Sequence, residues 1–148
     1  MRIIRDRPGS FELEEVLRRP LFAHLATLSD DGPRDSPVWF LWEDEAIWII
    51  GDDAADSFPA RLRGHPSCAL GIVQFERGIG LVRHVGIRGT ASMEPFDRAL
   101  AIRLLSRYLG GDRSKWDPRF LRSLETSTNV LVRVTPKTVV ARDVSYEC

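Results

Sequence analysis

Cysteine is scarce in this chain, which has only two in 148 residues: Cys68 inside an apolar segment and Cys148 at the C-terminal end. Two cysteines so placed make neither a disulfide framework nor a metal-binding motif. We expect both to be reduced thiols with structural roles. The three histidines, His24, His65 and His84, are too scattered to suggest a metal triad. The sequence therefore predicts no metal site.

Long apolar runs and net charge are also lacking. No segment approaches the roughly 20 apolar residues of a membrane-spanning helix, and the N-terminal MRIIRDRPGS lacks the apolar core of a signal peptide. We therefore expect a cytoplasmic location. The 21 basic and 21 acidic residues cancel, so we expect neither nucleic acid nor a membrane as a partner. Length and composition fit a single globular domain over residues 1–148.

Tryptophan, by contrast, is concentrated in SPVWFLWEDEAIWII (residues 36–50), which holds three of the four tryptophans. The two-residue period of a strand sends alternate residues to opposite faces of each arm of a hairpin. One arm divides into Val38, Phe40 and Trp42 against Trp39 and Leu41, and the other into Ala46, Trp48 and Ile50 against Ile47 and Ile49. Both faces are apolar, whereas an antiparallel sheet usually leaves one face to water. The hairpin needs a second cover: a helix, a partner subunit or a flat ligand.

Caps, helical spacing and glycine or proline stops predict four helices. These helices lie within residues 10–19, with Ser10 as N-cap, 57–64, 94–111, and 116–127, with Asp117 as N-cap. Strands are predicted at 21–28, 67–75 and 81–93, with two closing strands at 129–136 and 137–144 around a Pro–Lys turn. Residues 67–75 have the composition of a strand buried on both faces, and 29–35 that of a turn.

Six or seven strands joined by links too short for parallel crossovers predict a mainly β, antiparallel fold. We expect a small barrel with short flanking helices, because closure removes the exposed edges that an open sheet of this size presents.

The most chemically suggestive stretch is GDDAADSFPARLRGHP, residues 51–66. Ser57 stands at the N-cap position of a two-turn helix, whose exposed amides favour an anion. Arg61 and Arg63 carry guanidinium groups suited to phosphate. Because they are two residues apart, they do not share a helical face, and at most one faces the phosphate. The alternative is that Ser57 only caps the helix and both arginines are solvated.

The order of these segments resembles a known family. LATLSDDGPRDSPVWFLWEDEAIWII, the helix ending RLRGHP, the strand CALGIV and the strand HVGIRGTASM together look like the pyridoxamine 5′-phosphate oxidase-like family of flavin-binding split β-barrels, over roughly residues 10–142. The resemblance implies a homodimer with flavin at the subunit interface. The isoalloxazine ring and the other protomer would then be the second cover of the tryptophan hairpin.

The resemblance also assigns residues to the flavin. It implies Ser36, Val38 and Trp39 beside the ring, Gly51 near the ribityl chain, and Ser57, Phe58, Arg61 and Arg63 at the phosphate. Trp116 either stacks on the partner's flavin ring or anchors the last helix. His84 is a weaker candidate for the flavin or substrate pocket.

The chain departs from the family pattern at the phosphate. Many relatives carry a lysine at Ser57 or Phe58 and often an asparagine at Arg61, so Arg61 or Arg63 would meet the phosphate charge instead. FMN is the expected cofactor, and the changed phosphate end leaves FAD or a deazaflavin as alternatives. The ending VVARDVSYEC does not match the segment that holds pyridoxal phosphate, and that substrate is not predicted. The expected function is a flavin-dependent oxidoreductase whose chemistry belongs to the cofactor. A flavin storage protein and an empty or haem-binding dimer are the alternatives.

Overall fold

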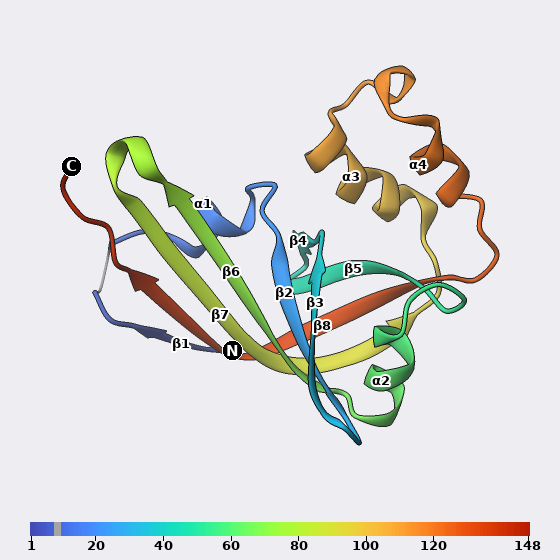
Figure 1. The fold of residues 1–148 in the computed structure, drawn as a ribbon, viewed down its shortest axis with the longest axis horizontal. Coiled ribbons are helices and arrows are strands. Elements are labelled where there is room, and N and C mark those ends of the chain that lie inside the picture. The colour runs from blue at the N-terminus through green and yellow to red at the C-terminus, as the bar shows by residue number, and fades with distance from the viewer. Residues whose placement is uncertain (8–9) are drawn as a thin grey trace.

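A computed structural model describes residues 1–7 and 10–148, in which eight strands form one sheet flanked by short helices (Figure 1). The strands are β1 (Arg2–Arg5), β2 (Ala23–Ser29), β3 (Gly32–Val38), β4 (Leu41–Glu43), β5 (Ala46–Asp52), β6 (Ser67–Glu76), β7 (Leu81–Glu94) and β8 (Asn129–Asp143). The helices are α1 (Leu13–Leu17), α2 (Phe58–Gly64), α3 (Arg98–Leu109) and α4 (Pro118–Ser123), with 3₁₀ turns η1 (Arg77–Ile79) and η2 (Arg113–Lys115).

The sheet has the predicted antiparallel character and runs in the order β3-β2-β6-β7-β8-β5-β4. The mainly β, split-barrel class is therefore confirmed. The expected closure is wrong, because no pairing joins β3 to β4 within residues 1–7 and 10–148, and both remain edge strands. The eighth strand is β1, which the sequence analysis missed; it pairs with β8 in parallel.

The C-terminal segment is one long strand rather than the two predicted. β8 pairs with β7 along its length, and the register shifts between Arg88 and Gly89 so that Gly89 faces Pro136. This bulge accepts Pro136, which has no N–H to give to a ladder. Gly89 is required there because a Cβ would collide with the Thr135 carbonyl oxygen. A proline thus sits inside a strand that it would otherwise have ended.

Three further boundaries differ from the prediction. Helix α1 starts behind Glu12, which forms a capping box with Glu15, instead of behind Ser10. The predicted turn at 29–35 is much shorter, because β3 already begins at Gly32, whose φ of 105° lies in the region that favours glycine. Strand β6 buries only one face, since Val73 is 52% and Phe75 59% exposed.

The two predicted faces of the tryptophan hairpin are confirmed, and each packs in its own core. Val38, Phe40, Ile47 and Ile49 join the core enclosed by the sheet, with Trp42 packed against it. Trp39, Leu41, Trp48 and Ile50 instead pack with α3 and α4, which lie together above β4 and β5 at one end of the molecule (Figure 1). Two helices of the same chain thus supply much of the second cover, and the flavin ring and partner subunit implied by the resemblance stay a prediction.

Helices α3 and α4 both begin at a capping aspartate, of which Asp117 was predicted and Asp97 was not. Asp97 accepts a hydrogen bond from the Leu100 N–H at the start of α3, and Gly110 follows its end. Asp117 likewise accepts from the Arg119 N–H at the start of α4. These caps fix where the apolar face of each helix meets the hairpin.

Candidate functional site

The site begins at a break in the sheet, at residues 39–40 between β3 and β4, and α3 supports this break. The Tyr108 hydroxyl accepts a hydrogen bond from the Phe40 N–H at 3.1 Å and donates one to the Leu21 carbonyl at 2.7 Å. Arg107 donates to the Phe40 carbonyl. Burial raises the pKa of Tyr108, so its hydroxyl stays neutral and both donates and accepts. The backbone groups freed by the break are therefore satisfied by side chains.

The same helix fixes the orientation of Trp39. Its indole stacks on the Tyr108 ring, with centroids 4.5 Å apart and planes 1° apart, and on Phe120 of α4 at 5.6 Å and 19°. Sequence reasoning identified Trp39 but missed Tyr108 and Phe120. Their helical spacing indicates only that they face a core, and their contact with Trp39 depends on how the helices dock.

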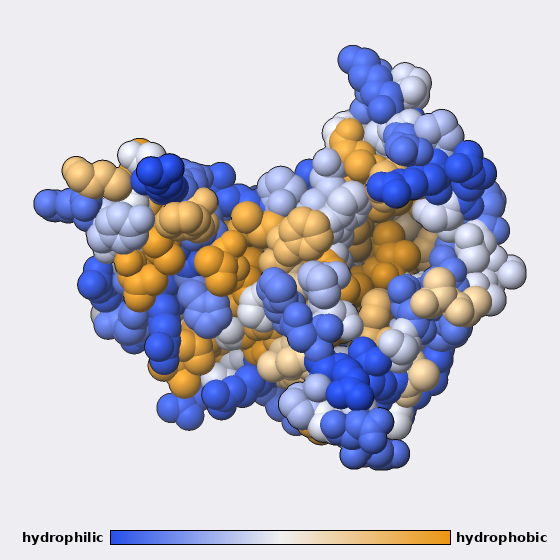
Figure 2. Space-filling model, in the orientation of Figure 1, coloured by the Kyte–Doolittle hydropathy of each residue, from blue (hydrophilic) through white to orange (hydrophobic). Residues whose placement is uncertain are grey.

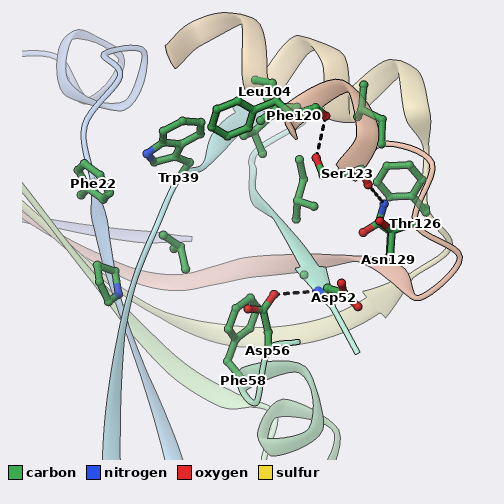
Figure 3. Close-up of a pocket in the computed structure, with 17 residues that line it drawn as sticks. Phe22, Trp39, Asp52, Asp56, Phe58, Leu104, Phe120, Ser123, Thr126 and Asn129 are labelled. Carbon is green, nitrogen blue, oxygen red and sulfur yellow. Dashed lines mark hydrogen bonds between the residues drawn. The ribbon is translucent and has the colours of Figure 1, made fainter. Parts of the chain in front are cut away.

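Beside Trp39 lies a pocket of about 410 Å³ between the sheet and the α3–α4 pair. On the side of the sheet it is lined by Val38, the last residue of β3, and by Trp39, which follows it. On the helical side it is lined by Leu104 of α3 and Phe120 of α4 (Figure 3). Figure 2 shows apolar side chains inside the hollow that separates the helical end from the rest of the molecule. Phe22, 56% exposed, stands at its edge. Such an aromatic hollow suits a flat ring.

Two more residues implied by the resemblance, Gly51 and Phe58, also line this pocket. A Cβ on Gly51 would lie 3.0 Å from Pro59 Cγ and 3.3 Å from Phe58 Cε2. The glycine thus lets the first turn of α2 pack closely on β5, which brings the Phe58 ring to the pocket wall.

Two of the residues assigned to the ring or the phosphate, Ser36 and Ser57, meet at the side chain of Arg61. Its Nε donates to Thr27 Oγ1 at 2.8 Å, Nη1 to Ser57 Oγ at 2.8 Å and Nη2 to Ser36 Oγ at 3.3 Å. The sequence did not predict Thr27, which is only 1% exposed, as a site residue. Its polar side chain on the inward face of strand β2 was the one feature of the sequence that could have indicated it. Ser36 precedes the pocket residue Pro37, so the hydroxyl cluster adjoins the pocket.

All three partners of Arg61 are neutral, and no carboxylate in the described part of the chain pairs with it. Arg63 differs, because it donates to both oxygens of Asp53 at 2.6 and 2.9 Å. This hydrogen-bonded pair lowers the pKa of Asp53. Of the two arginines considered from sequence, Arg61 is therefore the one with charge to offer an anion.

Ser57 occupies the predicted N-cap position of α2, but its hydroxyl makes no capping hydrogen bond. It accepts from Arg61 instead. The groups that can meet an anion here are therefore the Arg61 guanidinium and the hydroxyls around it, and not the amides of this seven-residue helix.

Two other candidates lie away from the pocket. Trp116 is 4% exposed, packs in the α3–α4 core, and donates its Nε1–H to the Gly110 carbonyl at 2.8 Å. These contacts match the alternative in which Trp116 anchors the last helix. His84 lies on the outer face of the sheet, over Gly71 and Gly86.

Carboxylates line the side of the pocket formed by the end of β5 and the loop after it. The Asp52 N–H donates to Asp56 Oδ2 at 2.9 Å, and Asp52 Oδ1 accepts from Ala54 N at 2.9 Å and from the Thr128 hydroxyl. The Thr128 hydrogen bond is the main reason that the pKa of Asp52 is lowered. This edge of the pocket is therefore negative.

Within residues 1–7 and 10–148, no three histidine, cysteine, aspartate or glutamate side chains lie together in a way that could hold a metal ion. None of the helices that the structure describes has the length and apolar character needed to cross a membrane.

Comparison with known proteins places these features in context. The family model for pyridoxamine 5′-phosphate oxidase matches residues 11–141. Among proteins with curated descriptions, none has a matching sequence.

Three of the solved structures that share the fold show the likeness. One is named F420 reductase (TM-score 0.66, 23% identity, covering 90% of this chain and 98% of that chain). Another is a conserved hypothetical protein from Mycobacterium tuberculosis (0.74, 20%, 93% and 86%), and a third is a FAD-binding protein from Mesorhizobium loti (0.65, 17%, 93% and 96%). At these identities the likeness establishes the fold.

Proposed function

Because the chain belongs to the pyridoxamine 5′-phosphate oxidase family over residues 11–141, we propose that it binds FMN and acts as a flavin-dependent oxidoreductase on a small substrate. The observation that carries this proposal is Arg61, a guanidinium with only hydroxyl partners, next to an aromatic pocket. A cytoplasmic location remains a prediction from the sequence.

The donors around Arg61 fit a phosphate. A guanidinium has five N–H groups, and three are used on Thr27, Ser57 and Ser36, so two are left. Ser36 and Ser57 have hydroxyl hydrogens that can turn toward an oxyanion. Arg61 is partly exposed, and with the Ser36 and Ser57 hydroxyls it offers one charge and two further donors. This set of donors suits a single phosphate monoester and therefore favours FMN over FAD, which carries a longer pyrophosphate.

The pocket beside this cluster fits the ring. β3 is an edge strand in the part of the chain described, so one side of its backbone is unpaired next to Val38 and Trp39. Those groups can give the ring hydrogen bonds while the apolar walls exclude water. When bound, the flavin supplies hydride or single-electron transfer; this chain's residues bind, orient and shield it.

We further propose that the functional unit is a homodimer. Val73 and Phe75 project from the outer face of β6 and are each more than half exposed, as is Phe22 at the pocket edge. Apolar side chains exposed in this way on a sheet mark an association surface. A second copy covering Phe22 would also narrow the open side of the pocket.

The proposed cofactor site is tested by titrating FMN into the wild-type protein and into Arg61→Ala and Arg63→Ala, following the quenching of flavin fluorescence. We expect Arg61→Ala to weaken FMN binding by about 1.5–3 kcal/mol, the range for a charge-assisted hydrogen bond. Arg63→Ala is the matched control, because Arg63 is already paired with Asp53, and its affinity should stay near that of the wild type.

Arg61→Lys keeps the charge but loses the planar fork, and should give an intermediate affinity. Thermal unfolding of each variant separates lost binding from lost folding. Equal FMN affinity in all four proteins would contradict the proposal. An FMN complex that neither NADH nor NADPH reduces would instead favour the storage alternative.

A further inference from the structure

The charged residues that line the pocket are all of one sign. Of the 17 lining residues, Asp52 and Asp56 are the only ones that carry charge, and no lysine, arginine or histidine of the described chain lines it. Figure 3 shows both aspartates on one side of the pocket and Trp39 and Phe120 on the other. The pocket therefore combines an aromatic wall with an anionic edge.

These two carboxylates keep acceptor capacity for a ligand. Asp52 Oδ1 accepts hydrogen bonds from Ala54 N and the Thr128 hydroxyl, and Asp56 Oδ2 accepts one from the Asp52 N–H. The Ala55 N–H also helps to lower the pKa of Asp52. Within residues 1–7 and 10–148, neither aspartate forms an ion pair, and no hydrogen bond reaches Asp56 Oδ1. Their negative charge is therefore not compensated by the protein.

The neighbouring Asp53 does not share this property. It is neutralised by the bidentate contact with Arg63. The negative charge at this edge of the pocket thus comes from Asp52 and Asp56, at the side away from Trp39, and it favours positive charge there.

The wall opposite the two aspartates is aromatic and favours ligands of flat shape. The Trp39 indole is held by stacking on Tyr108 and Phe120, and Leu104 lies beside it. A rigid aromatic face favours flat groups and attracts cations through its quadrupole. Shape and charge therefore point to the same class of ligand.

We infer that the substrate taken into this pocket beside the cofactor is a planar cation or a planar N–H donor, such as an amidinium or a protonated nitrogen heterocycle. Its donors meet Asp52 and Asp56 and its face lies on the helical side of the pocket at Phe120, while the flavin ring lies along β3 at Val38 and Trp39. Planar anions are rejected. The inference rests on the proposed function, which it deepens by naming a substrate class.

The test compares three nearly isosteric planar probes that differ in charge: benzamidine, benzamide and benzoate. Each is titrated into the FMN-loaded protein and into the protein without added flavin, and tryptophan fluorescence and the flavin spectrum are followed. Each partly solvated carboxylate is expected to contribute about fivefold, so benzamidine should bind at least about tenfold more tightly than benzoate. Added salt should reduce that ratio.

Asp52→Asn and Asp56→Asn should each lower the benzamidine-to-benzoate preference by about threefold to fivefold. Asp31→Asn is the matched control, because it removes the same charge from a side chain that is 88% exposed in the β2–β3 turn, and it should leave the preference unchanged. Phe120→Ala should weaken benzamidine and benzamide alike, which places the probes in this pocket.

The outcomes separate the two proposals. A charge preference without FMN binding would support this substrate class and contradict the proposed cofactor. FMN binding with undetectable benzamidine binding, with benzoate bound equally well, or with an unchanged preference in both aspartate variants would overturn the inference and leave the cofactor proposal standing.

Discussion

At the scale of single residues, Arg61 and Arg63 show what the sequence can predict about the anion site and what it cannot. Their spacing predicts that only one of them serves an anion, because residues two apart point to different sides of a helix. It does not predict which one. That choice depends on Asp53, which pairs with Arg63, and on Thr27 from a distant strand, which orients Arg61. Long-range partners of this kind are invisible to local patterns.

Cys68 gives a prediction about pH. Burial raises the pKa of Cys68 from 9.0 to about 11, so the folded protein holds a neutral thiol at pH 8.5. Iodoacetamide reacts with thiolates, and it should modify the exposed Cys148 far faster than Cys68 in the native protein. Because the folded pKa is the higher one, this preference for the neutral thiol stabilises the fold below about pH 9 and is lost as pH rises through 11.

Peptide mass spectrometry after timed alkylation at pH 8.5 and at pH 10.5, in buffer and in urea, measures both sites. We expect Cys68 to react quickly only in urea or toward the higher pH. Equal rates for the two cysteines in native protein at pH 8.5 would show that the Cys68 thiol is accessible and ionised.

At the scale of elements, patterns predicted the helices and the two-faced hairpin, because caps and alternation are local. They failed where a strand carries an irregularity. β8 continues through Pro136 because a bulge opposite Gly89 absorbs the proline, and β3 stops at Val38 because Tyr108 and Arg107 satisfy the backbone of Phe40. Both irregularities are stabilised by groups far away in the sequence.

The Tyr108 hydroxyl is expected to contribute to the free energy of unfolding, because it bridges two backbone groups. Tyr108→Phe keeps the ring that stacks on Trp39 but leaves the Phe40 N–H and the Leu21 carbonyl without their shared partner. We expect a loss of about 1–3 kcal/mol in the free energy of unfolding. FMN affinity should also fall, because the break that carries Trp39 would loosen.

Urea unfolding and FMN titration measure these two effects. Tyr146→Phe removes a hydroxyl from a side chain that is about half exposed, and it should change neither quantity. Identical unfolding midpoints for wild type and Tyr108→Phe would mean that the hydroxyl bridge contributes nothing to the site.

At the scale of the whole molecule, the sequence predicted the mainly β class but not the open sheet. The prediction of closure assumed that exposed edges would be avoided. Here β3 and β4 remain edges, and the pocket lies beside the edge strand β3. The exposed Val73 and Phe75 were predicted to be buried, and a second copy of the chain is the cover that we propose for them.

The dimer prediction is tested by multi-angle light scattering. We expect a mass of twice the 16.8 kDa chain for the wild type and a monomer for Phe75→Asp, because a charge in an apolar interface is strongly unfavourable. Ile3→Asp is the control; it places the same charge on another exposed apolar residue, on β1, and should remain dimeric. A monomeric wild type would contradict the proposed dimer.

The most direct measurement of the central claim is the visible absorption spectrum of the purified protein, before and after addition of FMN, with chromatography of any small molecule that heat releases. Our account predicts a flavin spectrum, release of FMN, and loss of that spectrum in Arg61→Ala under the same purification. A colourless protein that does not take up added FMN, or a haem spectrum in its place, would contradict it.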